Sequence, residues 1–375
     1  MKFKLRKNYE EARTGVIETQ RGAINTPVFM PVGTQGSVKT ASFTELKETG
    51  AQIILGNTYH LYLRPGDRII KKMGGLHNFI NWDRPILTDS GGYQVFSLGE
   101  GSRGEKLVKI TNDGVEFKSH LDGKKHIFTP EGVIDIQINL GSDIMMPLDV
   151  CPSANAGKEE IAKAVRLTTN WFERAHNHYS KIKTSKGALF AIVQGGTHKN
   201  LRKESYLGLS KFSVDGFSIG GVANAGESKI KQKEALKITL PLLPEEKPRY
   251  LMGVGMPEDI LYAVEMGVDM FDCVAPTRMA RNGAVFTKWG RMNLFNSKYK
   301  TEVGPIEKGC TCYACKNHSK AYIRHLLVSG EILGIRLTTL HNLSFMSGLM
   351  LDIQQAIRDN NFSKFKKSFL TGYRK

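Results

Sequence analysis

The feature that most constrains the fold of this chain is a series of eight short apolar segments, most of them joined by helical or loop connections. Near-continuous apolar strands that alternate with helices are typical of a parallel sheet covered by helices, because both faces of each strand are buried. Eight such strands predict an α/β fold, the (β/α)8 TIM barrel. The segments are residues 27–32, 52–56, 85–88, 143–148, 188–193, 216–219, 250–255 and the run that ends at Asp272.

Polar residues and glycines stand where several of these strands end. They are Asp89, Asp149, Gln194, Gly220-Gly221 and Asp272. Any one of them is weak evidence, since strand ends are often polar for unrelated reasons. In a barrel, however, the carboxyl ends of all strands meet on one rim, where the active site of such folds lies. The sequence therefore predicts a polar site on this rim.

One region breaks the barrel pattern. Between residues 95 and 128, apolar and polar residues alternate around Asn112-Asp113-Gly114 and Asp122-Gly123, a pattern typical of surface hairpins. The organisation we expect is a barrel over residues 1–300 with a hairpin insertion around 95–128, a small subdomain over 301–345, and a C-terminal helix and basic tail over 346–375 that pack on the barrel.

The stretch around Asp272 carries the clearest chemical signal. An apolar run delivers this carboxylate, Pro276 then prevents the strand from continuing, and Arg278 and Arg281 follow. A buried carboxylate beside two arginines suits a polyanionic substrate that is attacked at carbon. The other interpretation is a helix cap followed by two solvated arginines, and the spacing alone does not separate the two.

The charge of the chain favours a nucleic-acid partner. It has 53 Lys and Arg against 36 Asp and Glu, a formal net charge of +17. Such an excess favours contact with a phosphate backbone, although a merely soluble basic surface is the alternative. No apolar run is long enough to span a bilayer, and residues 1–7 lack the apolar core of a signal peptide. We expect a cytoplasmic enzyme with no membrane contact.

The cysteines predict a metal site. There are five, an odd number that argues against a disulfide framework in a long chain. Cys310, Cys312 and Cys315 cluster, and with His341 they make a closed tetrahedral set for one structural Zn²⁺ ion. His318 and His325 are competing candidates for the fourth ligand. The expected subdomain over 301–345 is therefore a zinc-binding one.

Five ordered motifs resemble those of bacterial tRNA-guanine transglycosylases, the queuine tRNA-ribosyltransferase family. They are Thr-Asp-Ser-Gly-Gly-Tyr-Gln at 88–94, Val-Gln-Gly at 193–195, Tyr-Leu-Met-Gly-Val-Gly at 250–255, Phe-Asp-Cys-Val-x-Pro-Thr-Arg at 271–278, and Cys-x-Cys-x2-Cys with the later His. The resemblance covers nearly the full length. It implies a barrel with a zinc subdomain, a homodimer, and a glycosyltransferase (pentosyltransferase) of queuosine biosynthesis. Such an enzyme exchanges the wobble guanine of tRNAs with G-U-N anticodons for 7-aminomethyl-7-deazaguanine (preQ1).

The resemblance also implies a role for each residue of the motifs. Asp272 is the expected nucleophile, because a carboxylate can trap the positive charge that develops at the sugar carbon as a covalent intermediate. Asp89 is the expected general acid/base for the departing and the incoming base. The base must leave the anticodon stack to react. Its expected contacts are Asp149, Gln194, Gly221, Val222 and Cys151 around its edge, Tyr93 and Met252 on its faces, and Arg278, Arg281 and Thr277 on the tRNA.

Three positions depart from the bacterial pattern. The loop 220–227 is one residue longer than usual, which puts in doubt the residue that borders the aminomethyl group. Val150 stands where a Glu is usual, and Met279-Ala280 replaces a smaller pair. These departures limit how far the resemblance carries over to the base pocket.

Two other functions compete with this one. The first is a barrel glycoside hydrolase that uses Asp89 and Asp272 as its two carboxylates; the net charge of +17 and the presence of only three tryptophans to stack on sugars argue against it. The second is a non-catalytic RNA-binding subunit, which would be expected to lose the catalytic carboxylates, whereas both are present.

Overall fold

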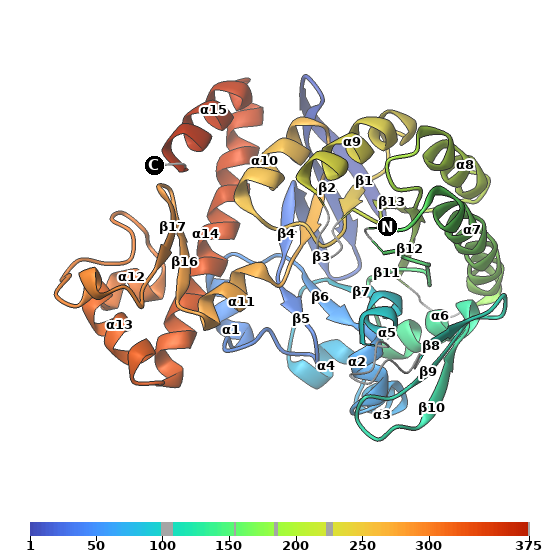
Figure 1. Cartoon of the computed structure of the whole chain (residues 1–375), viewed down its shortest axis with the longest axis horizontal. Coiled ribbons are helices and arrows are strands. Elements are labelled where there is room, and N and C mark those ends of the chain that lie inside the picture. The colour runs from blue at the N-terminus through green and yellow to red at the C-terminus, as the bar shows by residue number, and fades with distance from the viewer. Residues whose placement is uncertain (99–107, 154, 184–186, 223–227, 374–375) are drawn as a thin grey trace.

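Nine short strands form the central sheet of the computed structural model, which describes residues 1–98, 108–153, 155–183, 187–222 and 228–373. All neighbouring pairs in this sheet are parallel, and helices surround it (Figure 1). The strands are β4 (Val28–Met30), β5 (Val32–Gly33), β6 (Ile54–Asn57), β7 (Ile86–Asp89), β11 (Ile144–Met145), β12 (Ala188–Val193), β13 (Gly216–Ile219), β14 (Arg249–Leu251) and β15 (Met270–Asp272).

The predicted eight-stranded barrel is confirmed. The sheet counts nine strands because Pro31 divides one of the eight into two. The predicted strand 27–32 is divided at Pro31, which has no N–H to give to a ladder. Its first half, β4, pairs with β15, and its second half, β5, pairs with β6. The sheet therefore closes on itself through this one interrupted strand.

Helices follow most of the strands on the outside. They are α1 (Phe43–Glu48), α2 (Thr58–Leu63), α3 (Asp67–Lys72), α4 (Leu76–Ile80), α5 (Gly92–Leu98), α6 (Pro130–Leu140), α7 (Lys158–Lys181), α8 (Lys199–Leu209), α9 (Lys229–Thr239), α10 (Pro257–Glu265) and α11 (Ala275–Arg281). A capping box begins α1: the Ser42 hydroxyl accepts from Glu45 N, and the Glu45 carboxylate accepts from Ser42 N.

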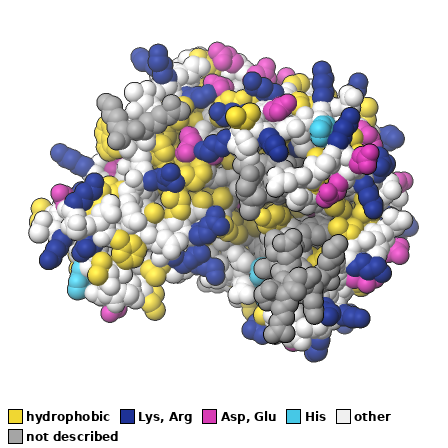
Figure 2. Space-filling model, in the orientation of Figure 1, with side chains coloured by type: hydrophobic (Ala, Val, Ile, Leu, Met, Phe, Trp, Pro, Cys, Tyr) yellow, Lys and Arg dark blue, Asp and Glu magenta, His cyan; other side chains and the backbone are white. Residues whose placement is uncertain are grey.

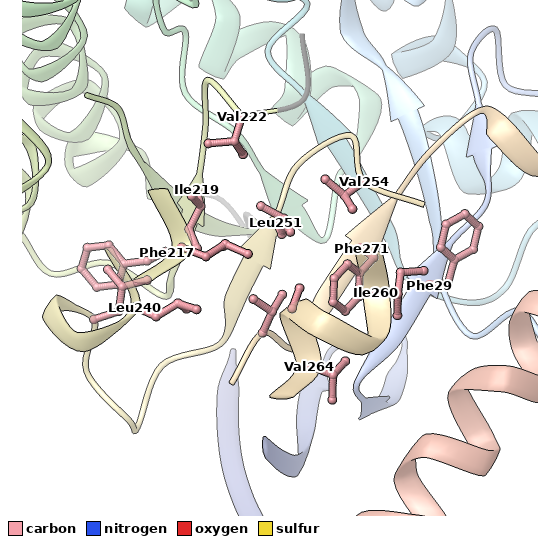
Figure 3. Close-up of a cluster of buried hydrophobic side chains, with 14 of the residues drawn as sticks. Phe29, Phe217, Ile219, Val222, Leu240, Leu251, Val254, Ile260, Val264 and Phe271 are labelled. Atoms are coloured by element: carbon pink, nitrogen blue, oxygen red, sulfur yellow. The ribbon is translucent and has the colours of Figure 1, made fainter. Parts of the chain in front are cut away.

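Alternation along the strands divides the core into two layers. In β12 all residues are buried; Phe190 and Ile192 belong to the cluster inside the barrel, whereas Leu189 and Val193 face the surrounding helices. Figure 3 shows the outer layer, where strand residues lie against α10. The labelled strand residues are Phe29, Phe217, Ile219, Leu251 and Phe271, and those of α10 are Ile260 and Val264.

An antiparallel sheet that the sequence did not predict closes the other end of the barrel. It consists of β1 (Lys2–Tyr9), β2 (Ala12–Thr19) and β3 (Gly22–Thr26). Ile17 and Ile24 are fully buried, and with the partly buried Phe3 they join the cluster inside the barrel. Arg13 fixes this sheet to the start of β15, because its Nε and Nη2 donate to the two Asp269 carboxylate oxygens at 3.0 and 2.5 Å.

The alternating region after α5 forms a second antiparallel sheet, made of β8 (Val108–Ile110), β9 (Val115–Lys118) and β10 (Lys125–Phe128). Residues 99–107 of the predicted insertion lie outside the described residues. The remaining elements are two short 3₁₀ helices (Leu240–Leu242 and Ser297–Tyr299), β16 (Ala284–Thr287), β17 (Gly290–Asn293), α12 (Tyr313–Asn317), α13 (Lys320–Val328), α14 (Ile332–Arg358) and α15 (Phe362–Tyr373).

Helix α14 connects the C-terminal elements to the barrel. It packs against α11, α13, α15, β4 and β16, and it continues through residue 345, so the expected units 301–345 and 346–375 share a helix. The proposed division into three units stays a prediction. In the described part of the chain, none of the helices is both long and apolar enough to cross a bilayer.

We predict that Arg13→Met lowers the free energy of unfolding by about 3 to 5 kcal/mol, because it leaves the Asp269 carboxylate buried without its partner. The two side chains are only 3% and 0% exposed. Lys4→Met removes the exposed ion pair with Glu18 on the same sheet and should change stability by less than about 1 kcal/mol. Urea denaturation of both variants measures the difference; equal losses would contradict a special role of the buried pair.

Candidate active site

The polar residues predicted at the strand ends lie on the carboxyl rim of the barrel. Asp89 closes β7 and Asp272 closes β15, while Asp149, Gln194 and Gly221 stand in the segments that follow β11, β12 and β13. Because all these strands are parallel, the five positions share one edge.

Asp89 is held by the segment that follows β6. Thr58 N donates to its Oδ1 at 3.0 Å, Gly91 N donates to the same oxygen at 3.2 Å, and Asn57 Nδ2 donates to its Oδ2 at 2.5 Å. Burial, with a smaller contribution from the charge of Asp272, raises the pKa of Asp89 to about 7, although the hydrogen bond from Thr58 opposes the rise. At neutral pH, both the acid and the carboxylate form of Asp89 are therefore populated.

Asp272 is held differently. The Tyr250 hydroxyl and Gly253 N both donate to its Oδ1, at 2.6 and 2.7 Å. Burial raises its pKa, but both donors favour the ionised form. The Asp272 charge also contributes to the raised pKa of Asp89, so the two carboxyl groups are close enough to interact electrostatically. One carboxyl group is thus equipped to act as an anion, and the other to carry a proton.

A second polar pair lies beside these carboxyls. Gln194 Nε2 donates to Asp149 Oδ2 at 2.7 Å, and the buried Gln194 Oε1 has no partner among the described residues. Burial raises the pKa of Asp149 to about 6. The loop after β13 passes close to this amide: a Cβ on Gly220 or Gly221 would come within 2.6 Å of it. The pair can give a ring both hydrogen-bond donors and acceptors.

The other predicted site residues lie around these pairs. Tyr93 on α5 is 45% exposed, whereas Val222 is 3% exposed and packs in the outer core. Cys151 and Met252 are partly buried. Loop residues 223–227 lie outside the described residues.

Helix α11 follows Asp272 directly and carries the predicted tRNA contacts. Arg278 is exposed and Arg281 partly so. Thr277 is 5% exposed, and its hydroxyl donates to Val274 O at 3.2 Å within the helix. Of the three residues, only the two arginines therefore present a polar group outward.

The three clustered cysteines and His341 lie together. His341 Nδ1 is 3.8, 3.6 and 3.4 Å from the sulfurs of Cys310, Cys312 and Cys315. Tetrahedral zinc bound at usual lengths requires a separation of about 3.6 Å between sulfur and nitrogen ligands. His341 Nε2 donates to Phe286 O at 2.7 Å, which leaves Nδ1 free to bind a metal. The residues thus fit one closed metal site, with His341 as its histidine.

Sequence reasoning missed the groups that hold the two carboxyls. Asn57 and Thr58 follow a predicted strand end and could have been found by the same rule that found Asp89. Tyr250 lies within an apolar run, and its direction into the barrel depends on strand pairing, so no local signal marks it.

The fold and the site define a TIM-barrel protein with a pair of carboxyl groups on its rim and a four-residue set that could hold one metal ion. Comparison with known proteins is more specific: the family model described as queuine tRNA-ribosyltransferase matches residues 8–375. The chain belongs to this family.

Several curated relatives carry the same description. A queuine tRNA-ribosyltransferase from Thermoanaerobacter pseudethanolicus is 54% identical over 362 residues, 96% of this chain and 94% of the relative. One from Fusobacterium nucleatum is 52% identical over 373 residues, 99% and 98% of the two chains. One from Dictyoglomus turgidum is 51% identical over 362 residues, 96% and 92%. The similarity thus extends over the barrel and the metal site alike.

We predict that Cys312→Ser lowers the bound metal well below one ion per chain and reduces thermal stability, because serine is a poor ligand for zinc. Cys312 also caps α12 by accepting from Cys315 N, a role that serine fills equally well, so loss of stability reports on the metal. Cys151→Ser, outside the cluster, is the control. Elemental analysis of both proteins decides; an unchanged metal content in Cys312→Ser would remove it from the ligand set.

Proposed function

We propose that this protein exchanges the guanine at the wobble position of tRNAs with G-U-N anticodons for preQ1, through a covalent ribosyl intermediate on Asp272. The observation that carries this proposal is the unequal pair of carboxyls on the rim. Asp89 has a pKa of about 7, and Asp272 accepts two hydrogen bonds that favour its anion. The family membership and the four-residue metal set support the same reading.

In the first step, an Asp272 carboxylate oxygen attacks C1′ of the wobble nucleotide while the bond from C1′ to N9 of guanine breaks. The electron pair of that bond passes to the purine, and Asp89 supplies the proton that neutralises it. The strand stays intact, because the ribose remains joined to both of its phosphates.

The second step makes and breaks these bonds in the opposite direction. The incoming base loses its N9 proton to the Asp89 carboxylate, N9 attacks C1′, and the ester to Asp272 breaks. Asp272 is then a carboxylate and Asp89 an acid, as at the start. A single residue can serve both steps only if its two protonation states are close in free energy, which a pKa near 7 provides.

Recognition of the flipped base falls to the second polar pair. The unpartnered Gln194 Oε1 and the Asp149 carboxyl are suited to the donor-rich edge of a guanine-like base. The close approach of Gly220 and Gly221 brings backbone groups to the same edge. Tyr93 and Met252 would cover the two faces of the ring, with Cys151 and Val222 beside it.

The basic character of the chain suits an RNA substrate. Arg278 and Arg281, on the helix after Asp272, would hold the anticodon loop, with Thr277 beside them. Figure 2 shows Lys and Arg side chains spread across the face of the molecule that is also seen in Figure 1, with hydrophobic side chains between them. The metal would be a structural Zn²⁺, one per chain, and we propose a cytoplasmic homodimer.

The deciding experiment is incorporation of labelled guanine into a G-U-N tRNA, with the same tRNA carrying another base at the wobble position as control. Label should enter only the first tRNA, and preQ1 should compete with it. No incorporation by folded, metal-loaded protein would exclude base exchange. Release of free base without incorporation would instead indicate a hydrolase.

We predict that Asp272→Asn abolishes exchange, with a loss of at least about a thousandfold, because an amide cannot act as the nucleophile. tRNA affinity should change by less than about tenfold, since Arg278 and Arg281 remain. A protein–RNA adduct stable to denaturing gel electrophoresis should form with wild type and be absent from the variant. Exchange that survives the substitution would remove Asp272 from this role.

The rate of guanine release should depend on pH through Asp89. Release needs the protonated form, whose population falls about tenfold per pH unit above a pKa of about 7. We predict a single-turnover rate that is level below pH 6 and declines above pH 7. Asp89→Asn should lower the rate about 10²- to 10⁴-fold and remove the decline. A decline that persists in the variant would assign the ionisation to another group.

A further inference from the structure

The sheet formed by β8, β9 and β10 has two unlike faces. In its register, Lys109 is opposite Glu116, Glu116 is opposite Ile127, and Lys118 is opposite Lys125. Because side chains alternate along a strand, these five project from the same face, and all are exposed. This basic sheet face carries three lysines and one glutamate. The opposite face carries Val115, Phe117 and Phe128, which are buried.

Among the residues that the structure describes, the three lysines have no acidic partner. Some other lysines do pair with a carboxylate, as Lys4 does with Glu18 and Lys47 with Asp83. Within the described residues, neither Lys109, Lys118 nor Lys125 lies within 4.0 Å of a carboxylate oxygen. They also line one groove of about 450 Å³ that residues of all three strands border. Their positive charge is therefore available to an anion from outside.

The buried face of the sheet attaches it to the active site. The Tyr59 hydroxyl lies 2.8 Å from His120 Nδ1, and the Tyr59 ring packs on Phe117 with centroids 5.4 Å apart. Tyr59 follows Thr58, whose N–H donates to Asp89. The sheet is thus connected to the proposed acid/base, Asp89, through Tyr59 and the adjacent Thr58.

The sheet also lies on the far side of the rim from the arginines. In Figure 1 the ends of β5, β6 and β7 lie between α11 on one side and β8–β10 on the other. A nucleic acid whose wobble nucleotide enters at these strand ends extends its chain beyond both sides of them. One side meets Arg278 and Arg281, and the other side meets the basic sheet face.

We propose that the basic sheet face binds the phosphate backbone of the substrate RNA, opposite to α11; this inference rests on the proposed function. Unpaired lysines on an exposed surface bind phosphates mainly by releasing condensed counterions, without reading sequence. The half-exposed Ile127 between them packs against sugar without a hydrogen-bond requirement. The basic sheet face adds affinity and orients the RNA, whereas the residues of the barrel rim select the base.

The test is a triple variant, Lys109→Gln, Lys118→Gln and Lys125→Gln, compared with a matched one, Lys163→Gln, Lys203→Gln and Lys237→Gln. The control lysines are exposed on α7, α8 and α9. Both variants lose three charges. Binding of a G-U-N tRNA is measured from about 50 to 200 mM salt, together with the KM for tRNA in guanine exchange.

The expected result is a fall in the slope of log affinity against log salt by about 2 to 3 in the sheet variant, with a KM for tRNA at least about tenfold higher. The control should keep the wild-type slope and KM. Equal behaviour of the two variants, with a wild type that exchanges guanine, would overturn the proposal. A wild type that neither binds nor exchanges would refute the proposed function instead.

Two further outcomes are separated by other measurements. A change of oligomeric state in the sheet variant, seen by sedimentation, would identify the face as a contact between protein chains and overturn the proposal. If the triple variant loses thermal stability, the single substitution Lys118→Glu replaces it, since it reverses one exposed charge. An unchanged salt slope and KM in that variant would count against the proposal in the same way.

Discussion

The partial or complete removal of three rim carboxyl groups from water is the constraint on which the rest of this structure depends. Removing a carboxylate from water is costly unless donors compensate it, and the fold supplies a different set to each. Asp89 receives backbone N–H groups and an amide, Asp272 a phenol and one N–H, and Asp149 the amide of Gln194. These unequal surroundings separate the three groups chemically, although all are aspartates. Loops alone would not hold such donors in place; parallel strands that end together do.

The C-terminal elements support the same rim from outside. Two residues of α14 fix the helix that carries the arginines: the Thr338 hydroxyl donates to Ala280 O at 3.1 Å, and Asn342 Nδ2 donates to Pro276 O at 2.9 Å. The neighbour of Asn342 is the metal-site residue His341. The metal site is therefore remote from the carboxyls but connected to α11 through one turn of one helix. A metal ion held by these residues would thus stabilise the position of α14, and through it that of α11, without an open coordination position of its own.

Local signals predicted much of this from the sequence, and long-range pairing accounts for what was missed. The barrel, its strand-end residues and the cysteine cluster depend on periodicity and spacing, which are visible in short windows. The sheet β1–β3 was missed for two reasons. Its lysines obscure the alternation of apolar and polar residues, and its apolar residues are buried only by their contact with the barrel. Tyr250 was missed because a strand's apolar character does not say which side chain points inward. That Pro31 divides the first predicted strand is visible only in the pairing of its two halves with β15 and β6.

The sheet β1–β3 determines from which side of the barrel a molecule can reach the rim. It seals the amino-terminal end of the barrel with Phe3, Ile17 and Ile24, so the interior is not a channel. Any molecule held at the rim must therefore enter and leave from the same, carboxyl-terminal side of the barrel.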